Sequence, residues 1–171
     1  MQSLILFVAQ GFGAGRIPIA PGTFGSLVGL LWFFLLVQTH SFWWYAAGML
    51  FGLVVSVWLS GRAERILNQT DPGSIVIDEI AAMPLCFVWW MGTLCFHEGR
   101  CLLPREFLEG NNRWRLLIIF VLFRFFDIVK PWPIGRLQKL PSGWGVTADD
   151  VLAAIYVAAL SAIPQFWSRV T

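Results

Sequence analysis

Three charged side chains interrupt an apolar stretch in the second half of the chain. They are Arg124, Asp127 and Lys130, in the sequence RFFDIVKPWP. If a helix runs from Trp114 onward, residues at three-residue steps share one face about 120° wide, and Pro131 ends the helix. One interpretation is a buried salt bridge between Arg124 and Asp127 that only neutralises itself. The other is that these groups act on a ligand, and this stretch alone does not decide between the two.

Two pairs of acidic residues begin other apolar runs. The pairs are Asp78 and Glu79, before the run 80–96, and Asp149 and Asp150, before the last run of the chain. Each pair alone is also typical of a helix N-terminus, where negative charge is favourable. Carboxylates at a membrane border are costly unless they are paired or bound to metal, and Mg²⁺ prefers oxygen ligands. Together with Asp127, the two pairs therefore predict a Mg²⁺ site.

The predicted site assigns these residues to three roles. The metal ligands are Asp78, Glu79, Asp127, Asp149 and Asp150, of which Asp78, Asp127 and Asp150 are also the predicted catalytic residues. The predicted phosphate-binding residues are Lys130, Arg124, Thr23 and Ser26. The Lys130 ammonium would attract phosphate as a single positive charge, and the Arg124 guanidinium could donate two parallel hydrogen bonds to it. Arg124 could instead orient Asp127. Thr23 and Ser26 stand at an expected helix start, where backbone N–H groups favour anions, while Gly25 and Gly29 there are equally consistent with close helix packing.

The nucleophile is predicted to be a metal-activated water. Cys95 and Arg100 miss the six-residue spacing of Cys-dependent phosphatases by one residue, and Trp144 follows Pro141–Gly143 where His-dependent lipid phosphatases carry His. Both histidines, His40 and His97, are expected at the opposite end of the bundle.

The composition predicts an integral membrane protein. Of the 171 residues 57% are hydrophobic and 13% charged, the mean hydropathy is +0.69, and residues 1–171 are expected to form a single domain. The net charge of +2 comes from scattered basic residues, so a nucleic-acid surface is excluded. The three cysteines, Cys86, Cys95 and Cys101, are odd in number and lie in or beside apolar sequence, which favours buried free thiols over a disulfide framework.

The predicted fold is an all-α multihelical bundle with about four to five apolar helices. After a packed or interfacial N-terminal helix, we expect a helix that is capped by Thr23 or Ser26 and ends at Val37, and then a helix 42–60. A polar loop containing Arg62, Glu64 and Arg65 leads to a helix 80–96 that Pro84 kinks. A solvated connection 97–115, a helix from Trp114 and a Gly-rich loop 140–146 precede the last helix. If five helices cross the membrane, all the acidic motifs lie at one end. Seven basic residues at that end against five at the other favour a cytoplasmic site.

Four motifs carry a family resemblance. They are APGTFGS (20–26), DPGSIVIDE (71–79), FRFFDIVKPWPI (123–134) and GWGVTADD (143–150), and together they resemble phosphatidylglycerophosphatase A. The resemblance implies a Mg²⁺-dependent hydrolase of the bacterial inner membrane, built as a bundle around one central helix. Its substrate would be phosphatidylglycerophosphate, and its products phosphatidylglycerol and phosphate. The sequence departs from the family pattern at Ala81, Ala82, Trp144 and Thr147, which leaves every carboxylate in place.

A membrane cation transporter or channel is the alternative function. Acidic residues and a Lys among apolar helices also describe an ion path. A path requires polar groups at successive depths, whereas these motifs are predicted to gather at helix ends.

Overall fold

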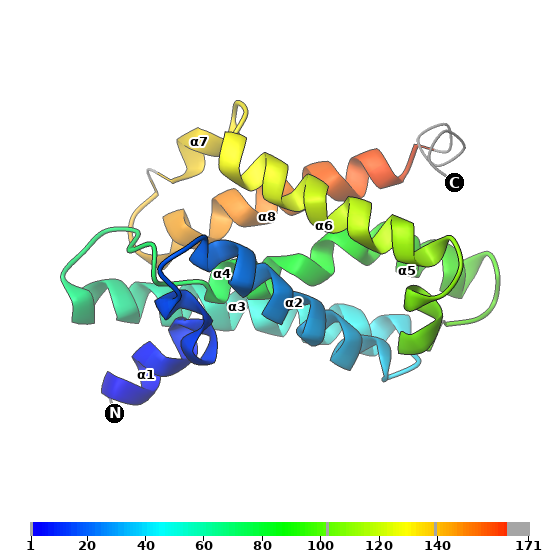
Figure 1. Ribbon diagram of the computed structural model, residues 1–171, viewed down its shortest axis with the longest axis horizontal. Coiled ribbons are helices and arrows are strands. Elements are labelled where there is room, and N and C mark those ends of the chain that lie inside the picture. Colours follow the sequence, from blue (N-terminus) through cyan, green and yellow to red (C-terminus); the bar gives the residue numbers. More distant parts are fainter. Residues whose placement is uncertain (1, 102, 139, 164–171) are drawn as a thin grey trace.

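The computed structural model describes residues 2–101, 103–138 and 140–163, and within these ranges it is helical without a strand (Figure 1). The elements, with η for 3₁₀ helices, are α1 (Gln2–Ala9), η1 (Gly11–Arg16), α2 (Pro21–Val37), α3 (Phe42–Leu67), α4 (Ile77–Ala82), η2 (Met83–Phe87), α5 (Val88–Phe96), η3 (Pro104–Leu108), α6 (Asn112–Val129), α7 (Ile134–Leu137) and α8 (Gly143–Ser161). The predicted all-α fold is confirmed. Pro164, near the expected end of the last run, lies outside the described residues.

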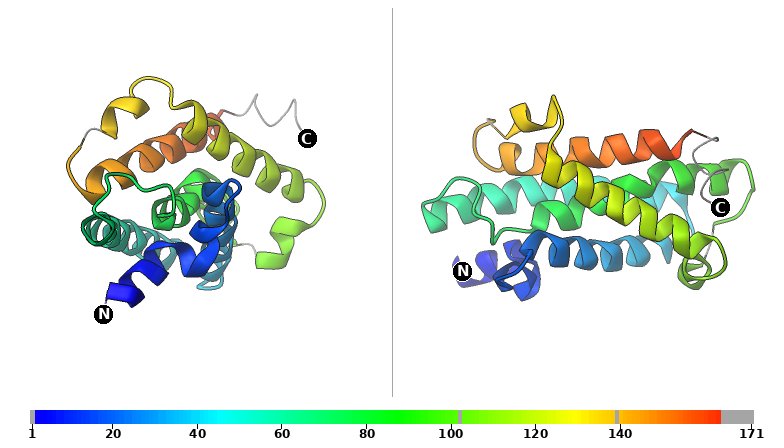
Figure 2. Two further views of the ribbon diagram at one scale, coloured as in Figure 1. Left: turned by 60° about the vertical axis from the view of Figure 1, so that its left-hand side comes forward. Right: turned by 45° about the horizontal axis from the view of Figure 1, so that its top comes forward.

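The segment α4–η2–α5 is the central helix of the bundle (Figures 1 and 2). Both α2 and α3 pack against α4, α6 packs against η2, and α8 contacts all three parts. Pro84 converts the middle of this segment to a 3₁₀ turn, as expected for a residue without a backbone N–H. The Tyr45 hydroxyl of α3 donates a 2.5 Å hydrogen bond to the Pro84 carbonyl oxygen. The predicted interruption at Pro84 is confirmed.

Aromatic side chains fill the core away from the acidic motifs. Phe33 of α2 stacks on Phe87 of η2 at 4.1 Å between ring centroids, and Phe107 meets Phe33 edge to face at 5.2 Å. Phe107 lies in η3 and is fully buried. The expectation that 97–115 is only a solvated connection is therefore wrong at this residue, because an apolar ring of this size gains more from burial than from water.

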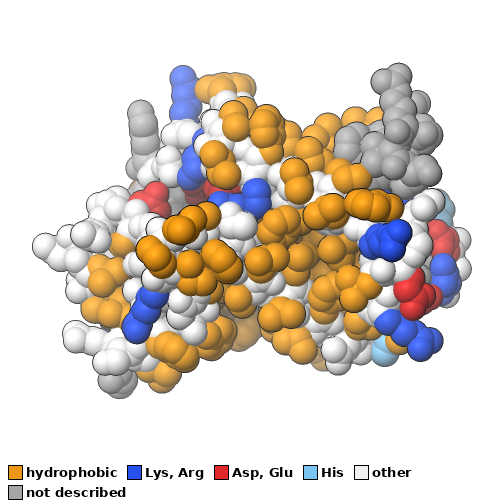
Figure 3. Space-filling model, in the orientation of Figure 1, with side chains coloured by type: hydrophobic (Ala, Val, Ile, Leu, Met, Phe, Trp, Pro, Cys, Tyr) orange, Lys and Arg blue, Asp and Glu red, His pale blue; other side chains and the backbone are white. Residues whose placement is uncertain are grey.

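Three helical segments are long and apolar enough to cross a membrane within the described residues. They are 42–67, 77–96 and 143–161, and α2 is a shorter apolar helix. Large apolar side chains cover the outside, and Figure 3 shows them as a broad band with charged groups toward both ends. These three segments, together with α2 and α6, match the four to five apolar helices predicted.

Several predicted boundaries are wrong. α3 continues to Leu67, so Arg62, Glu64 and Arg65 belong to the helix and not to a loop. α2 begins at Pro21, after Ala20 in the left-handed conformation, so neither Thr23 nor Ser26 is its N-cap. α8 begins at Gly143, so the second half of the expected Gly-rich loop is its first turn. Pro at the first helical position explains the early start of α2, since the N–H that Pro lacks has no helical partner there.

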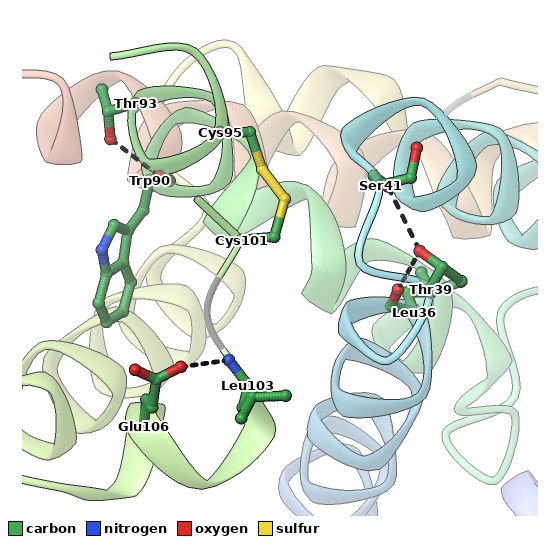
Figure 4. The surroundings of a disulfide bond; sticks show 9 residues. All are labelled: Leu36, Thr39, Ser41, Trp90, Thr93, Cys95, Cys101, Leu103 and Glu106. Carbon is green, nitrogen blue, oxygen red and sulfur yellow. Dashed lines mark hydrogen bonds between the residues drawn. A yellow bond between two sulfur atoms is a disulfide. The ribbon is translucent and has the colours of Figure 1, made fainter. Parts of the chain in front are cut away.

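The expectation of three free thiols is wrong for two cysteines. Cys95 at the end of α5 and Cys101 in the following loop form a disulfide bond (Figure 4), while Cys86 is free and buried. Gly99, with φ +65°, turns the chain between them and allows the two Cα atoms to lie 5.1 Å apart. This loop lies at the end of the bundle opposite the acidic motifs (Figure 1).

Candidate active site

Three helix segments bring the five predicted carboxylates together at one end of the bundle. The first turn of α4 supplies Asp78 and Glu79, the last turn of α6 supplies Asp127, and α8 supplies Asp149 and Asp150. Asp78, Asp127, Asp149 and Asp150 are between 2% and 8% exposed. The last two are the seventh and eighth residues of α8, too far along it to be explained by charge at the helix N-terminus.

The carboxylates form two groups that share one residue. Asp78, Glu79 and Asp150 make the first group, and Asp127, Asp149 and Asp150 make the second. In each group one oxygen from every carboxylate lies within 4.8 Å of the others. Oxygens this close repel one another when ionised, so a cation or bound protons must compensate them. Asp150 occupies the junction between the two groups.

Arg124 joins the carboxylates of two helices. Its Nη1 lies 2.7 Å from Asp127 Oδ2 and 3.8 Å from Glu79 Oε1, and it donates a 3.2 Å hydrogen bond to Ser26 Oγ. The salt bridge with Asp127 that the spacing allows is therefore present. It is not self-contained, because the same guanidinium also faces Glu79 and because Asp127 has further acidic neighbours.

Lys130 lies just beyond α6, as its left-handed C-cap before Pro131. Its Nζ is 2.5 Å from Asp149 Oδ2 and 3.9 Å from Asp127 Oδ1. Burial lowers the pKa of Lys130, but the hydrogen bond and charge of Asp149, with the charges of Asp127 and Asp150, outweigh burial and raise this pKa above its ordinary value. The ammonium group therefore stays protonated at neutral pH, at the edge of the acidic cluster.

Small residues let α2 approach α4 closely. A Cβ on Gly25 would lie 2.7 Å from Val76 Cβ, and one on Gly29 would lie 2.7 Å from Met83 Cβ. At Gly22 an added Cβ would collide with Glu79 Oε1 and come within 3.0 Å of Arg124 Nη2. The packing role of these glycines is thus present, and Gly22 in addition makes room for two charged side chains of the site.

Thr23 and Ser26 both lie on α2 near the site, but their surroundings differ. The Ser26 hydroxyl is fully buried, donates to the Gly22 carbonyl oxygen at 2.9 Å and accepts from Arg124. Thr23 is half-buried, and its backbone N–H donates to the Ala20 carbonyl oxygen at 2.9 Å. The hydroxyl of Ser26 is therefore used to hold Arg124, and the Thr23 N–H closes the turn that starts α2.

A polar network beside the cluster was not predicted. Glu64, in the last turn of α3, accepts a 2.9 Å hydrogen bond from the Asp71 backbone N–H, and Asp71 Oδ2 accepts one of 3.2 Å from Gln138 Nε2 of the α7 C-cap. Ser56 and Thr147 share a buried 3.0 Å hydrogen bond between α3 and α8. The DPG turn signal at Asp71 marked the loop, but no sequence signal indicated these long-range partners.

The residues of the cluster fit a hard divalent cation. Asp78 Oδ1, Glu79 Oε2 and Asp149 Oδ1 are buried and have no hydrogen-bond partner within the described residues. A buried carboxylate oxygen without a partner costs free energy, so each such atom needs an explanation. Carboxylate oxygens are the ligands that hard divalent cations prefer.

Known proteins resemble the chain over most of its length. A family model described as Phosphatidylglycerophosphatase A matches residues 7–165. A Haemophilus influenzae protein named "Phosphatidylglycerophosphatase A" is 32% identical over 95% of this chain and 90% of its own length, and an Escherichia coli K12 protein of the same name is 31% identical over 90% and 78%. A Bacteroides thetaiotaomicron protein named "Putative phosphatidylinositol-3-phosphatase" is 32% identical over 95% and 94%.

No solved structure matches the chain. The family model nevertheless spans the central helix and every carboxylate of the cluster, and the relatives cover nearly the whole chain. The resemblance in the four sequence motifs is thereby confirmed: the chain belongs to the phosphatidylglycerophosphatase A family.

Proposed function

We propose that the protein hydrolyses the terminal phosphate of phosphatidylglycerophosphate, giving phosphatidylglycerol and inorganic phosphate. The observation that carries the proposal is a set of buried carboxylate oxygens beside two cationic side chains. These oxygens, Asp78 Oδ1, Glu79 Oε2 and Asp149 Oδ1, have no hydrogen-bond partner among the described residues. Such a site suits a substrate that brings both a divalent cation and a phosphate. The names of the Haemophilus influenzae and Escherichia coli relatives support this substrate.

Mg²⁺ is the proposed cofactor, and the proposed ligands are Asp78, Glu79, Asp127, Asp149 and Asp150. When bound, it would lower the pKa of a water molecule and offset charge on the phosphate oxygens. The two groups of carboxylates share Asp150, so this residue would contribute wherever in the cluster the metal binds. Removing Asp150 is accordingly expected to be more damaging than removing a carboxylate that belongs to one group only.

The side chains of the site divide the remaining work. Lys130 would bind a phosphate oxygen as a point charge, and Arg124 would either do the same or hold Asp127 in place. Thr23, half-buried at the start of α2, would offer its hydroxyl to the phosphate, whereas Ser26 would act through Arg124. In this proposal the role of Ser26 is positioning.

The reaction moves one proton from the attacking water to the leaving oxygen. The water oxygen forms a new bond to phosphorus, and the bond between phosphorus and the glycerol oxygen breaks. The proton released by water passes through a carboxylate to that oxygen, which leaves as the alcohol. Asp78, Asp127 and Asp150 meet from three different helices and are the proposed catalytic residues for this transfer.

We also propose that the active site faces the cytoplasm and that the protein resides in the bacterial inner membrane. The Cys95–Cys101 disulfide joins the end of α5 to the following loop, and this part of the chain lies at the end of the bundle opposite the acidic residues (Figure 1). Disulfides persist in oxidising compartments such as the periplasm and are rare in the cytosol. This position supports the orientation that the distribution of basic residues favours. The gathering of acidic residues at one end also argues against an ion path through the bundle.

The substrate can be tested with the purified protein in detergent and Mg²⁺. Phosphate release would be compared for phosphatidylglycerophosphate, phosphatidylinositol 3-phosphate and phosphatidic acid at equal concentrations. We expect the highest kcat/KM for phosphatidylglycerophosphate. A higher kcat/KM for phosphatidylinositol 3-phosphate would instead favour the activity named for the Bacteroides relative. Glu109→Gln, an exposed carboxylate at the far end of the bundle, serves as the control variant and should leave the rates unchanged.

A further inference from the structure

A second polar site lies where α1 meets the C-terminal end of α3. A cavity of about 370 Å³ is lined by Gln2 and Ile5 of α1 and by Arg62, Arg65 and Ile66 of α3. The two helices pack side by side, at the same end of the bundle as the acidic cluster (Figure 1). The cavity is separate from that cluster, since it contains none of the five carboxylates.

The two guanidinium groups of this cavity have no acidic partner in the part of the chain that the structure describes. Neither Arg62 nor Arg65 forms an ion pair with any of the described residues. Arg65 Nε donates a 2.9 Å hydrogen bond to the Gly61 carbonyl oxygen, which leaves its other N–H groups available. Glu64, which lies between them in sequence, accepts from the Asp71 backbone instead. Both arginines are exposed, and α1 lies beside them. Cations near a helix C-terminus are favourable in themselves, but that effect requires no neighbouring helix.

The position of this cavity along α3 places it at the lipid headgroups. The 20 residues Phe42–Gly61 contain no charged side chain, and at about 1.5 Å per residue they span about 30 Å, the thickness of a bilayer core. Arg62 is the first charged residue after this stretch. Trp58, one turn earlier, is 53% exposed and lies under the Arg62 guanidinium at 5.8 Å, as expected for an aromatic anchor at the membrane interface.

We propose that the cavity between α1 and α3 binds the phosphate of an anionic phospholipid headgroup. Arg62 and Arg65 supply the charge, because two guanidiniums at headgroup depth attract phosphate and a basic pocket between helices is typical of anionic lipid sites. Gln2 contributes an amide to the lining, and Ile5 and Ile66 contribute apolar side chains. Since the acyl chains would lie outside along the exposed face of α3, the ligand is a lipid and not a soluble phosphate. This site would hold a lipid without hydrolysing it.

The test is native mass spectrometry of the intact protein in detergent with added phosphatidylglycerol or phosphatidylcholine. The Arg62→Gln/Arg65→Gln double variant is expected to bind phosphatidylglycerol about 30-fold more weakly at this site than the wild type, from about 1 kcal/mol per basic residue. The matched control is Arg105→Gln/Arg113→Gln, which removes the same charge at the opposite end, including an Arg that lies 5.4 Å from a Trp ring. This control should retain the lipid.

Three outcomes of the lipid-binding measurements would overturn the proposal. They are equal retention of phosphatidylglycerol by the double variant and the wild type, equal loss in the control variant, and no preference of the wild type for phosphatidylglycerol over phosphatidylcholine. Inorganic phosphate at the same concentration should not displace the lipid, and displacement would overturn the lipid as the occupant. All of these measurements are independent of phosphate release, so they can fail while the proposed hydrolysis holds.

Discussion

Asp127→Asn separates a metal ligand from a salt-bridge partner, because it keeps the side-chain volume and removes the charge. If Asp127 serves only to neutralise Arg124, the substitution breaks a buried ion pair, which typically costs about 3–5 kcal/mol. If Asp127 belongs to a carboxylate cluster built for a cation, the substitution also removes repulsion. The two interpretations therefore differ in the stability they predict for the metal-free variant.

The structure supplies the magnitude. Asp127 lies 2.7 Å from Arg124 and 3.9 Å from Lys130, and each of these cations keeps another carboxylate after the substitution. At an effective dielectric constant of about 20, the two attractions amount to roughly 10 kcal/mol. Repulsion from Asp149 and Asp150, whose oxygens lie at most 4.8 Å away, amounts to at least roughly 7 kcal/mol, and the charge of Glu79 adds to it. We therefore expect the free energy of unfolding of the metal-free variant to lie within about 2 kcal/mol of the wild-type value.

The assay is thermal unfolding in detergent, first with chelator and then with Mg²⁺, alongside phosphate release. At 100 times its Kd, Mg²⁺ should stabilise the wild type by about 2.7 kcal/mol, which raises Tm by roughly 5–10 °C. The Asp127→Asn variant should show a much smaller rise and no measurable turnover. A metal-free variant destabilised by 3 kcal/mol or more, or one with near-normal turnover, would refute the assignment of Asp127 as a ligand.

Three further predictions concern the surroundings of the cluster. Gly22→Ala should lower kcat/KM, because its Cβ collides with Glu79, whereas Gly92→Ala, whose Cβ meets only a ring carbon at 3.7 Å, should not. Lys130→Gln should lower kcat/KM by about 10- to 100-fold through weaker phosphate binding, measured as a raised KM, since a charged hydrogen bond contributes about 1.5–3 kcal/mol. A Cys introduced at the exposed Gly73 should react with an impermeant maleimide only from the cytoplasmic side, and a Cys at the exposed Asn111 only from the opposite side. Labelling of both positions from the same side would contradict the proposed orientation.

The gathering of the acidic residues could be predicted because it depends on helix order alone. Successive antiparallel helices return the chain to the same end, so motifs at the start of α4, the end of α6 and near the start of α8 meet. The candidate site residues were also conspicuous, because charges in apolar helices are rare and costly. The sequence does not show which carboxylate oxygens lack a hydrogen-bond partner among the described residues, or that Ser26 holds Arg124, because both depend on side-chain packing.

Helix ends and the disulfide could not be predicted in the same way. Arg62, Glu64 and Arg65 read as a polar loop, yet each is a good helix former, and Glu64 gains a backbone partner at Asp71 by staying helical. The pairing of Cys95 with Cys101 depends on a turn that brings their Cα atoms together, and an odd number of cysteines gave no sign of it.

The central claim is that the carboxylate cluster supports hydrolysis through a bound divalent cation, and phosphate release in the presence of chelator tests it most directly. Purified wild-type protein would be assayed with phosphatidylglycerophosphate in excess chelator, and Mg²⁺ would then be added back in steps. We expect no phosphate release in chelator and full recovery with Mg²⁺, because neither Cys nor His is placed in the cluster to supply another nucleophile among the described residues. Full turnover in excess chelator would contradict the account.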